Sequence, residues 1–316
     1  MPRKKRIIIG ARGSKLSIIQ AKGVISLLKK KTAGYAFSLK KIVTSGDKNK
    51  AWRRNDRGIF VKEIEEALLS GKIDLAVHSA KDLPTEIPPG LRLAGITKRE
   101  PPYDCVIFRE KTAFSRLKKG ALIGTGSPRR KSQLLRLRPD LKIKNLRGNL
   151  DTRIKKLENG EFDAIIAAVA GIKRLGYKNL SLECLPPEIM LPAAGQGALG
   201  IEIRTKDKIA ENFAKIITDL NTLRCVGSER VFLKEIEAGC RGPVGALAQI
   251  KNRRIFLEIN VLSPDGKRVI SLKKSARASD FESLGRALAK EAIKKGAKQI
   301  LNPDFAIGFE KNGLNP

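Results

Sequence analysis

The residues best placed for chemistry are Lys81 and Asp82, which follow an apolar stretch of the chain. They stand in residues 78–84 (HSAKDLP), directly after residues 73–77, whose apolar run predicts a buried strand. Open α/β sheets place their functional loops at the carboxyl ends of strands. Beside Lys81 in a cationic cleft, Asp82 should stay ionised and could stabilise a developing positive charge. The alternative is an ordinary turn in which Asp82 caps a neighbouring group.

Residues 124–130 (GTGSPRR) have the features of an anion-binding turn. They follow a short apolar run and open a predicted helix, so backbone N–H groups, the hydroxyls of Thr125 and Ser127 and the helix dipole would face an anion. Arg129 and Arg130 could add bidentate contacts to a carboxylate. The alternative is a capped helix start with a solvated pair of arginines.

Arginines stand at two further predicted strand-to-helix turns. Arg147 belongs to residues 146–149 (LRGN), with Arg153 following in the next helix, and Arg12 precedes Ser14 in the same way near the N-terminus. Arginine suits such positions because its charge persists and its fork fits a carboxylate. Three turns of this kind in one chain predict a ligand with several negative charges.

Cys240 is the cysteine whose surroundings favour reactivity. It stands in residues 237–243 (EAGCRGP), between glycines and next to Arg241, which would favour its thiolate. The single histidine, His78, leaves no two-histidine metal site and makes a protease-like cysteine improbable, so covalent attachment of a group is the better interpretation. The remaining cysteines are interpreted as small buried residues: Cys105, Cys184 and Cys225.

The composition predicts an anionic partner. The chain has 64 Lys plus Arg against 32 Asp plus Glu, a formal net charge of +32, which attracts polyanions. Aromatic residues make up 5%, few for the stacking surface of a single-strand binder, and no zinc-finger or basic-zipper spacing occurs. The apolar residues 7–9 are too short for a signal peptide, and nothing later approaches a membrane span. We therefore expect a soluble, cytoplasmic protein that binds neither nucleic acid nor membrane.

The hydrophobic pattern predicts an α/β fold class with two α/β lobes around a cleft, plus a small C-terminal α+β domain. Strands and helices alternate over residues 6–77 and again over residues 106–170, which is typical of parallel α/β sheets. Proline pairs at 101–102 and 186–187 suit crossovers between the lobes. The expected boundaries are 1–98 with 193–217 for domain 1, 99–192 for domain 2 and 218–316 for domain 3.

Taken together, these motifs resemble the porphobilinogen deaminase (hydroxymethylbilane synthase) family. The resemblance is carried, in order along nearly the whole chain, by residues 78–84, 127–130, 146–149, 163–176 (DAIIAAVAGIKRLG), 192–197 (PAAGQG) and 239–243. It implies two lobes like those of periplasmic binding proteins. It also implies a monomeric transferase of tetrapyrrole (haem, chlorophyll or corrin) biosynthesis that joins four porphobilinogen molecules head to tail into linear hydroxymethylbilane, releasing four ammonia.

The resemblance also implies the cofactor and the site residues. A dipyrromethane would be held by Cys240 as a thioether, Asp82 would be the catalytic carboxylate with Lys81 beside it, and no metal is needed. The implied cofactor-binding residues are Ser14, Lys81, Asp82, Thr125, Ser127, Arg129 and Arg130, and the implied substrate-binding residues are Arg12, Arg147, Arg153, Arg174 and Gln196.

The chain departs from the family pattern at several positions. Gly126 and Pro128 stand where the family usually has Ser and Leu, Ser17 replaces a usual Ala, and residues 47–57 form a shorter, more basic loop, either a lid or an ordinary surface loop. Two rival functions stay open from the sequence: a non-catalytic cytoplasmic polyanion-binding protein, since fold does not determine activity, and a nucleic-acid-binding protein driven by charge alone.

Overall fold

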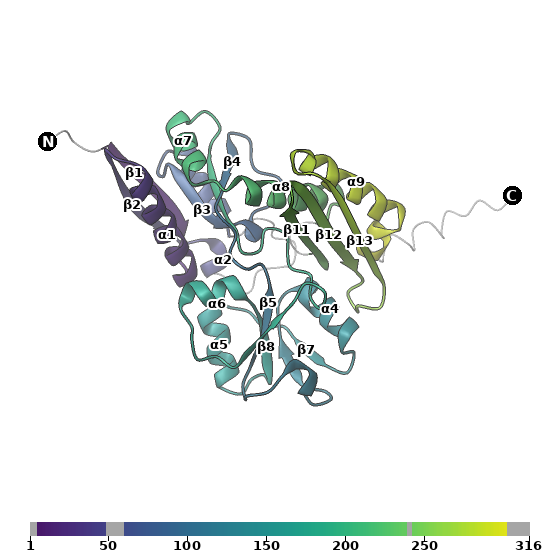
Figure 1. Cartoon of the computed structure of the whole chain (residues 1–316). Coiled ribbons are helices and arrows are strands. Elements are labelled where there is room, and N and C mark those ends of the chain that lie inside the picture. The colour runs from purple at the N-terminus through teal and green to yellow at the C-terminus, as the bar shows by residue number, and fades with distance from the viewer. Residues whose placement is uncertain (1–4, 49–59, 239–241, 302–316) are drawn as a thin grey trace. The chain divides into compact units, whose positions relative to one another are not determined.

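The computed structural model describes residues 5–48, 60–238 and 242–301 and divides into two compact units (Figure 1). The first unit holds residues 1–102, 170–177 and 195–223, and the second holds 103–169, 178–194 and 224–316. One five-stranded sheet lies in the first unit, while a second five-stranded sheet and a three-stranded sheet lie in the second.

The sheet of the first unit is mixed. Its strands, in spatial order, are β2 (Tyr35–Ile42), β1 (Lys5–Arg12), β3 (Leu75–Ser79), β10 (Leu199–Arg204) and β4 (Leu91–Ile96). β1 pairs in parallel with β2 and β3, whereas β10 runs antiparallel to both β3 and β4. The parallel pairing expected over residues 6–77 is therefore confirmed for β1, β2 and β3, whereas the antiparallel strand β10 lies outside that range. This strand follows residues of the second unit instead of a crossover helix, which a parallel neighbour would need.

Helices cover both faces of this sheet. On one face α1 (Lys15–Lys31) and α7 (Lys208–Ile217) pack on Leu75, Val77 and Ile201. On the other face, α3 (Lys62–Leu69) packs on Ala76. Successive residues of a strand point to opposite faces. Alternate residues of β3 therefore contact α1 and α7 on one face and α3 on the other. Two short helices, α2 (Ser45–Lys48) and η1 (Ala80–Asp82), complete the unit.

The second unit contains an α/β lobe with its own mixed sheet. The strand order is β7 (Lys142–Lys144), β6 (Leu122–Gly124), β8 (Ala164–Ala168), β5 (Asp104–Phe108) and β9 (Leu182–Leu185). β6 is parallel to β7 and β8, and β5 is antiparallel to β8 and β9. The parallel sheet expected over residues 106–170 is therefore wrong at β5, because β5 and its neighbour β8 are not consecutive strands joined by a crossover helix. The helices of this lobe are α4 (Pro128–Leu137) and α5 (Leu150–Glu158), with the one-turn helix η2 (Phe114–Arg116). The helix α6 (Val169–Leu175) follows β8, and all of it except Val169 belongs to the first unit.

The C-terminal part is an antiparallel sheet covered by helices, as the α+β expectation required. Its strands are β11 (Val244–Lys251), β12 (Arg254–Leu262) and β13 (Val269–Arg277), and its helices are α8 (Leu220–Glu235), η4 (Ala278–Asp280), α9 (Phe281–Lys294) and α10 (Ala297–Leu301). Figure 1 shows α9 lying along the sheet, and Leu284 and Leu288 of this helix enter the core. The predicted fold class is thus confirmed. The strand β11 was not expected from the sequence.

No helix in the described part of the chain is both long and apolar enough to cross a membrane.

Three ionisable side chains of the first unit lie close together on the sheet face that α3 covers. His78 Nε2 lies 3.0 Å from Glu202 Oε2, with side chains 4% and 0% exposed. Glu65 of α3 is also buried. Burial raises the pKa of the Glu65 carboxyl to about 7; the nearby Glu202 raises it further and His78 opposes the shift. This cluster therefore holds a proton near neutral pH that an exposed carboxyl would release.

We expect Glu65→Gln to change the pH dependence of stability. The unfolded chain releases the Glu65 proton near the ordinary carboxyl pKa of 4.5, whereas the folded protein holds it to about 7. The free energy of unfolding of the wild type therefore falls as the pH rises between these values. Glutamine has no such proton, so the variant should gain stability relative to wild type across this window in urea unfolding.

Glu158→Gln is the control, because Glu158 of α5 is exposed and is not among the groups that shift the pKa of Glu65. It should keep the wild-type pH dependence. A Glu65→Gln protein whose stability follows the wild-type curve throughout this pH range would contradict the assignment.

Candidate active site

The Lys81–Asp82 turn is held against the segment that precedes β10. The Ala80 amide donates to the Ala198 carbonyl at 3.0 Å, and Lys81 Nζ donates to Gln196 Oε1 at 3.2 Å. Gln196 is 1% exposed and its amide nitrogen donates to the Pro102 carbonyl at 2.6 Å. Asp82 itself is exposed. The structure thus brings together Lys81 and Gln196, which are 115 residues apart, and presents the Asp82 carboxylate to solvent.

Glycines make this close approach possible. Gly195 has φ +71°, and a Cβ there would stand 3.0 Å from the carbonyl carbon of Ala80. Gly197 has φ +90°, and a Cβ there would clash with the Glu100 carbonyl oxygen. Both positions therefore need glycine. The Arg174 guanidinium donates to the Gly197 carbonyl at 2.6 Å, and burial lowers the pKa of Arg174.

Arg12 and Ser14 mark the carboxyl end of β1. The Arg12 guanidinium stands 4.0 Å above the Phe60 ring, a cation–π contact. Ser14 Oγ caps α1 by accepting from the Ser17 amide at 3.3 Å, and it donates to Ser17 Oγ at 2.9 Å. The resemblance implies alanine at position 17. Ser17 therefore gives the Ser14 hydroxyl a contact that alanine could not make.

The second unit contains the predicted anion-binding turn as a capped helix start. Ser127 Oγ accepts from the Arg130 amide at 3.4 Å, and Thr125 Oγ1 accepts from the Ser127 amide at 3.2 Å. A Cβ on Gly126 would stand 2.9 Å from the Leu146 carbonyl oxygen. A serine there would therefore force the backbone of the neighbouring turn to move. The departure at position 126 fits this close approach.

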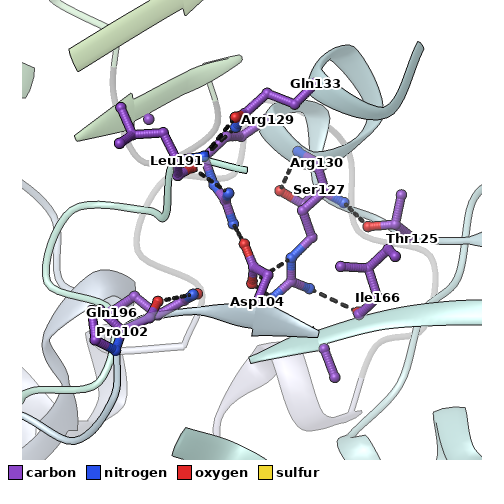
Figure 2. A network of polar contacts seen from close by, with 12 residues as sticks. Pro102, Asp104, Thr125, Ser127, Arg129, Arg130, Gln133, Ile166, Leu191 and Gln196 are labelled. Carbon is purple, nitrogen blue, oxygen red and sulfur yellow. Dashed lines mark hydrogen bonds and ion pairs between the residues drawn. The ribbon is translucent and has the colours of Figure 1, made fainter. Parts of the chain in front are cut away.

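Arg129 and Arg130 share one buried carboxylate, that of Asp104 (Figure 2). Arg129 Nη2 lies 2.8 Å from Asp104 Oδ2, while Nε and Nη2 of Arg130 donate to Oδ1 at 3.1 and 2.7 Å. Their other donors reach the Leu191 carbonyl at 2.7 Å and the Ile166 carbonyl at 3.0 Å. The side chains of Arg129, Arg130 and Asp104 are 5%, 7% and 0% exposed.

Asp104 was not predicted from the sequence as a functional residue. The available signal was an acidic residue opening an apolar strand, in residues 103–108 (YDCVIF), where a charge needs a partner. Burial lowers the pKa of Arg129, and Asp104 beside it opposes that shift. Two guanidinium groups and one carboxylate leave one net positive charge, so the cluster can still attract an anion.

The remaining predicted anchors of the second unit are more accessible. Arg147 is exposed, and Arg153 Nε donates to the Gly148 carbonyl at 2.8 Å in the turn before α5. Gly148 has φ +111°, a conformation that favours glycine. Both arginines therefore lie at the strand-to-helix turn that the sequence predicts.

The cysteines differ in their surroundings. Cys240 lies outside the described residues, as does most of the 47–57 loop. Cys105 and Cys225 are buried, as expected, but Cys184 is exposed. The buried interpretation of Cys184 is wrong because β9 is the edge strand of its sheet. Within residues 5–48, 60–238 and 242–301, no group of three or more His, Cys, Asp and Glu side chains could hold a metal ion.

Comparison with known proteins gives a consistent result. The family model "Porphobilinogen deaminase, dipyromethane cofactor binding domain" matches residues 7–212, and "Porphobilinogen deaminase, C-terminal domain" matches residues 223–294. The porphobilinogen deaminase of Geobacillus sp. (strain WCH70) is 43% identical over 303 residues, covering 94% of this chain and 97% of that protein. That of Maridesulfovibrio salexigens is 44% identical, covering 94% of this chain and 98% of the relative.

Among solved structures, the VFT2 domain of Bordetella pertussis BvgS aligns with a TM-score of 0.42 and 15% identity, covering 67% of this chain and 86% of that one. This likeness is too weak to carry an argument about function.

We expect Asp104→Asn to destabilise the protein by about 3–5 kcal/mol, because it removes the charge that compensates two buried guanidinium groups. Asp140→Asn is the control. Asp140 pairs with Arg138 at 2.7 Å, but the two side chains are 23% and 24% exposed, and accessible pairs contribute little. Urea unfolding of both variants measures the difference, and equal small effects would show that the buried pair carries no such role.

Proposed function

The chain belongs to the porphobilinogen deaminase family, and from this premise we propose which of its residues carry out the reaction. The enzyme is a transferase, a hydroxymethylbilane synthase of tetrapyrrole biosynthesis. It joins four porphobilinogen molecules head to tail into linear hydroxymethylbilane and releases four ammonia. Its cofactor is a dipyrromethane. When bound, this group supplies the nucleophilic pyrrole carbon at which the product chain grows.

We propose that Cys240 holds the cofactor through a thioether. The support is its sequence setting, between glycines and beside Arg241, since Cys240 lies outside the described residues. The donors of the second unit suit a group that carries acetate and propionate chains. They are the net positive cluster around Asp104 and the capped start of α4, where Thr125 and Ser127 stand. A helix start beside guanidinium groups favours carboxylates.

The proposed catalytic group is the Asp82 carboxylate, and the observation that carries this proposal is its exposed position on a turn fixed by Gln196 and Ala198. A carboxylate held there can accept a hydrogen bond from a pyrrole N–H. It can also stabilise the positive charge that develops on porphobilinogen as ammonia leaves. Lys81 would position this turn through its hydrogen bond to Gln196.

Four arginines are proposed to bind substrate carboxylates. Arg12 and Arg174 stand in the first unit, and Arg147 and Arg153 in the second. Arg12 keeps its guanidinium over an aromatic ring, which orients the planar group that would bind a carboxylate. Gln196, with both ends of its amide engaged, would act by holding Lys81. We further propose a cytoplasmic monomer whose partner is porphobilinogen, and neither nucleic acid nor a membrane.

Cys240→Ser tests the attachment. Wild-type protein produced with porphobilinogen supplied should carry a covalent addition of two pyrrole units by intact-mass measurement. The Cys240→Ser protein should show the bare polypeptide mass. Cys184→Ser, which removes the exposed thiol, is the control and should keep the addition. Wild-type protein at the bare mass, or an addition that persists without Cys240, would refute the proposal.

Asp82→Asn tests the catalytic role. The variant should fold with the wild-type melting temperature but lose a factor of about 100 or more in kcat for ammonia release, because the amide cannot stabilise developing positive charge as a carboxylate does. Glu86→Gln, an exposed acidic residue four positions along the chain, should keep the wild-type rate. Undiminished ammonia release by Asp82→Asn would remove the assignment.

A further inference from the structure

The buried His78–Glu202 pair joins β3 to β10 immediately before the Lys81–Asp82 turn. Gly200 lies opposite His78 and Glu202 lies opposite Ala76, so the two side chains are diagonal neighbours on one face. Their contact is 3.0 Å long, with both side chains nearly inaccessible. The reaction as proposed uses neither group.

A buried pair of this kind is not an efficient way to increase the free energy of unfolding. Removing a carboxylate and an imidazole from water costs free energy that their contact only partly returns, and apolar side chains of similar volume often stabilise as well. Glu202 Oε1 is buried and has no hydrogen-bond partner among the described residues, which adds to that cost. A polar contact that does not maximise stability can still specify one arrangement of two strands.

The register of β3 against β10 fixes the turn. Leu199 lies opposite Ser79, and continuing along the same two segments, Ala80 bonds to Ala198 and Lys81 to Gln196. A slip of β10 by one residue would separate the last two pairs and move alternate side chains to the wrong face. The His78–Glu202 contact therefore lies at one end of this series of contacts between β3 and β10, and Asp82 lies at the other end.

We propose that His78 and Glu202 are positioning residues that lock the register of β3 and β10 and thereby hold the Lys81–Asp82 turn in its working place. This inference rests on the proposed role of Asp82. It predicts that the pair contributes to kcat through the turn, with little effect on substrate affinity.

The double variant His78→Leu/Glu202→Leu separates positioning from stability, because apolar replacement of a buried ion pair can leave stability unchanged. We expect kcat to fall about 10-fold or more, as small misplacements of catalytic groups do, with KM within about 2-fold of wild type. Hydrogen exchange of the Ala80 amide should become at least about 10-fold faster, since it reports the contact with Ala198. Glu202→Gln gives the same comparison if the double variant fails to fold.

Glu211→Gln is the matched control, because it breaks an accessible ion pair with Lys215 in the same unit; it should leave kcat and Ala80 exchange unchanged. Wild-type exchange of the Ala80 amide in the folded double variant would overturn the positioning proposal, whatever the activity. Faster exchange with an unchanged kcat would support the lock and would instead contradict the role proposed for Asp82.

A second, independent observation concerns Cys105 and Cys184, which lie directly opposite each other on β5 and β9. The Phe108 amide donates to the Ser181 carbonyl at 2.8 Å, which makes that pair hydrogen-bonded. Alternation along an antiparallel ladder then makes Cys105 and Cys184 a non-hydrogen-bonded pair, with Cα atoms about 4.5 Å apart. That separation lies within the range that disulfides span.

We propose that Cys105 and Cys184 form a reversible disulfide when the protein meets a hydroperoxide. The exposed Cys184 thiolate attacks the peroxide O–O bond, becoming a sulfenic acid and releasing water or an alcohol. The Cys105 sulfur then displaces hydroxide from that sulfenic acid, forming the S–S bond as a second water leaves. Two thiols thus lose two electrons and two protons to one peroxide. Burial raises the pKa of Cys105 to about 12, which leaves Cys184 as the first to react.

Hydrogen peroxide treatment followed by alkylation and peptide mapping tests this site. A linked pair of peptides containing Cys105 and Cys184 should form and should disappear with dithiothreitol. Cys184→Ser should abolish the link, while Cys225→Ser, a control at a buried cysteine on α8, should keep it. Oxidation of Cys184 to a sulfinic acid without linkage, or no reaction at either thiol, would overturn the proposal.

Discussion

Buried carboxylates that pair with basic side chains are the interaction on which both units depend. A charge removed from water must be paired, because an unpaired one costs several kcal/mol. In the second unit, the Asp104 carboxylate pairs with Arg129 and Arg130, and so connects the start of α4 to β5. In the first unit, the Glu202 carboxylate contacts the His78 ring at the end of β3. The Lys81–Asp82 turn and the start of α4 therefore each stand beside a buried carboxylate.

This arrangement divides the basic residues into distinct sets. The chain has 64 Lys plus Arg and a formal charge of +32, yet the proposed anchors include six arginines and one lysine. Most N–H donors of Arg129 and Arg130 form hydrogen bonds inside the protein, whereas Arg147 is exposed. The net charge of the chain therefore does not show which arginines can reach a polycarboxylate. Surface cations such as Lys208 beside Glu211 contribute little to stability.

Local features of the site could be predicted from the sequence, because they depend on residues close together in the chain. The capped helix start at Ser127 and the turn after β3 follow from hydrophobic periodicity and from residues that favour turns. Contacts between distant segments could not be predicted in this way. Asp104 with Arg130, His78 with Glu202 and Lys81 with Gln196 each depend on strand order. The direction of β10 and the exposure of Cys184 depend on the same topology.

We expect the chain to extend a covalently held pyrrole chain one unit at a time. Intact-mass measurement of protein quenched at intervals after mixing with limiting porphobilinogen tests this expectation. We predict a series of protein-bound species that differ by one added pyrrole unit each, up to four additions, followed by return to the starting mass. A protein mass that never changes while hydroxymethylbilane accumulates would contradict it.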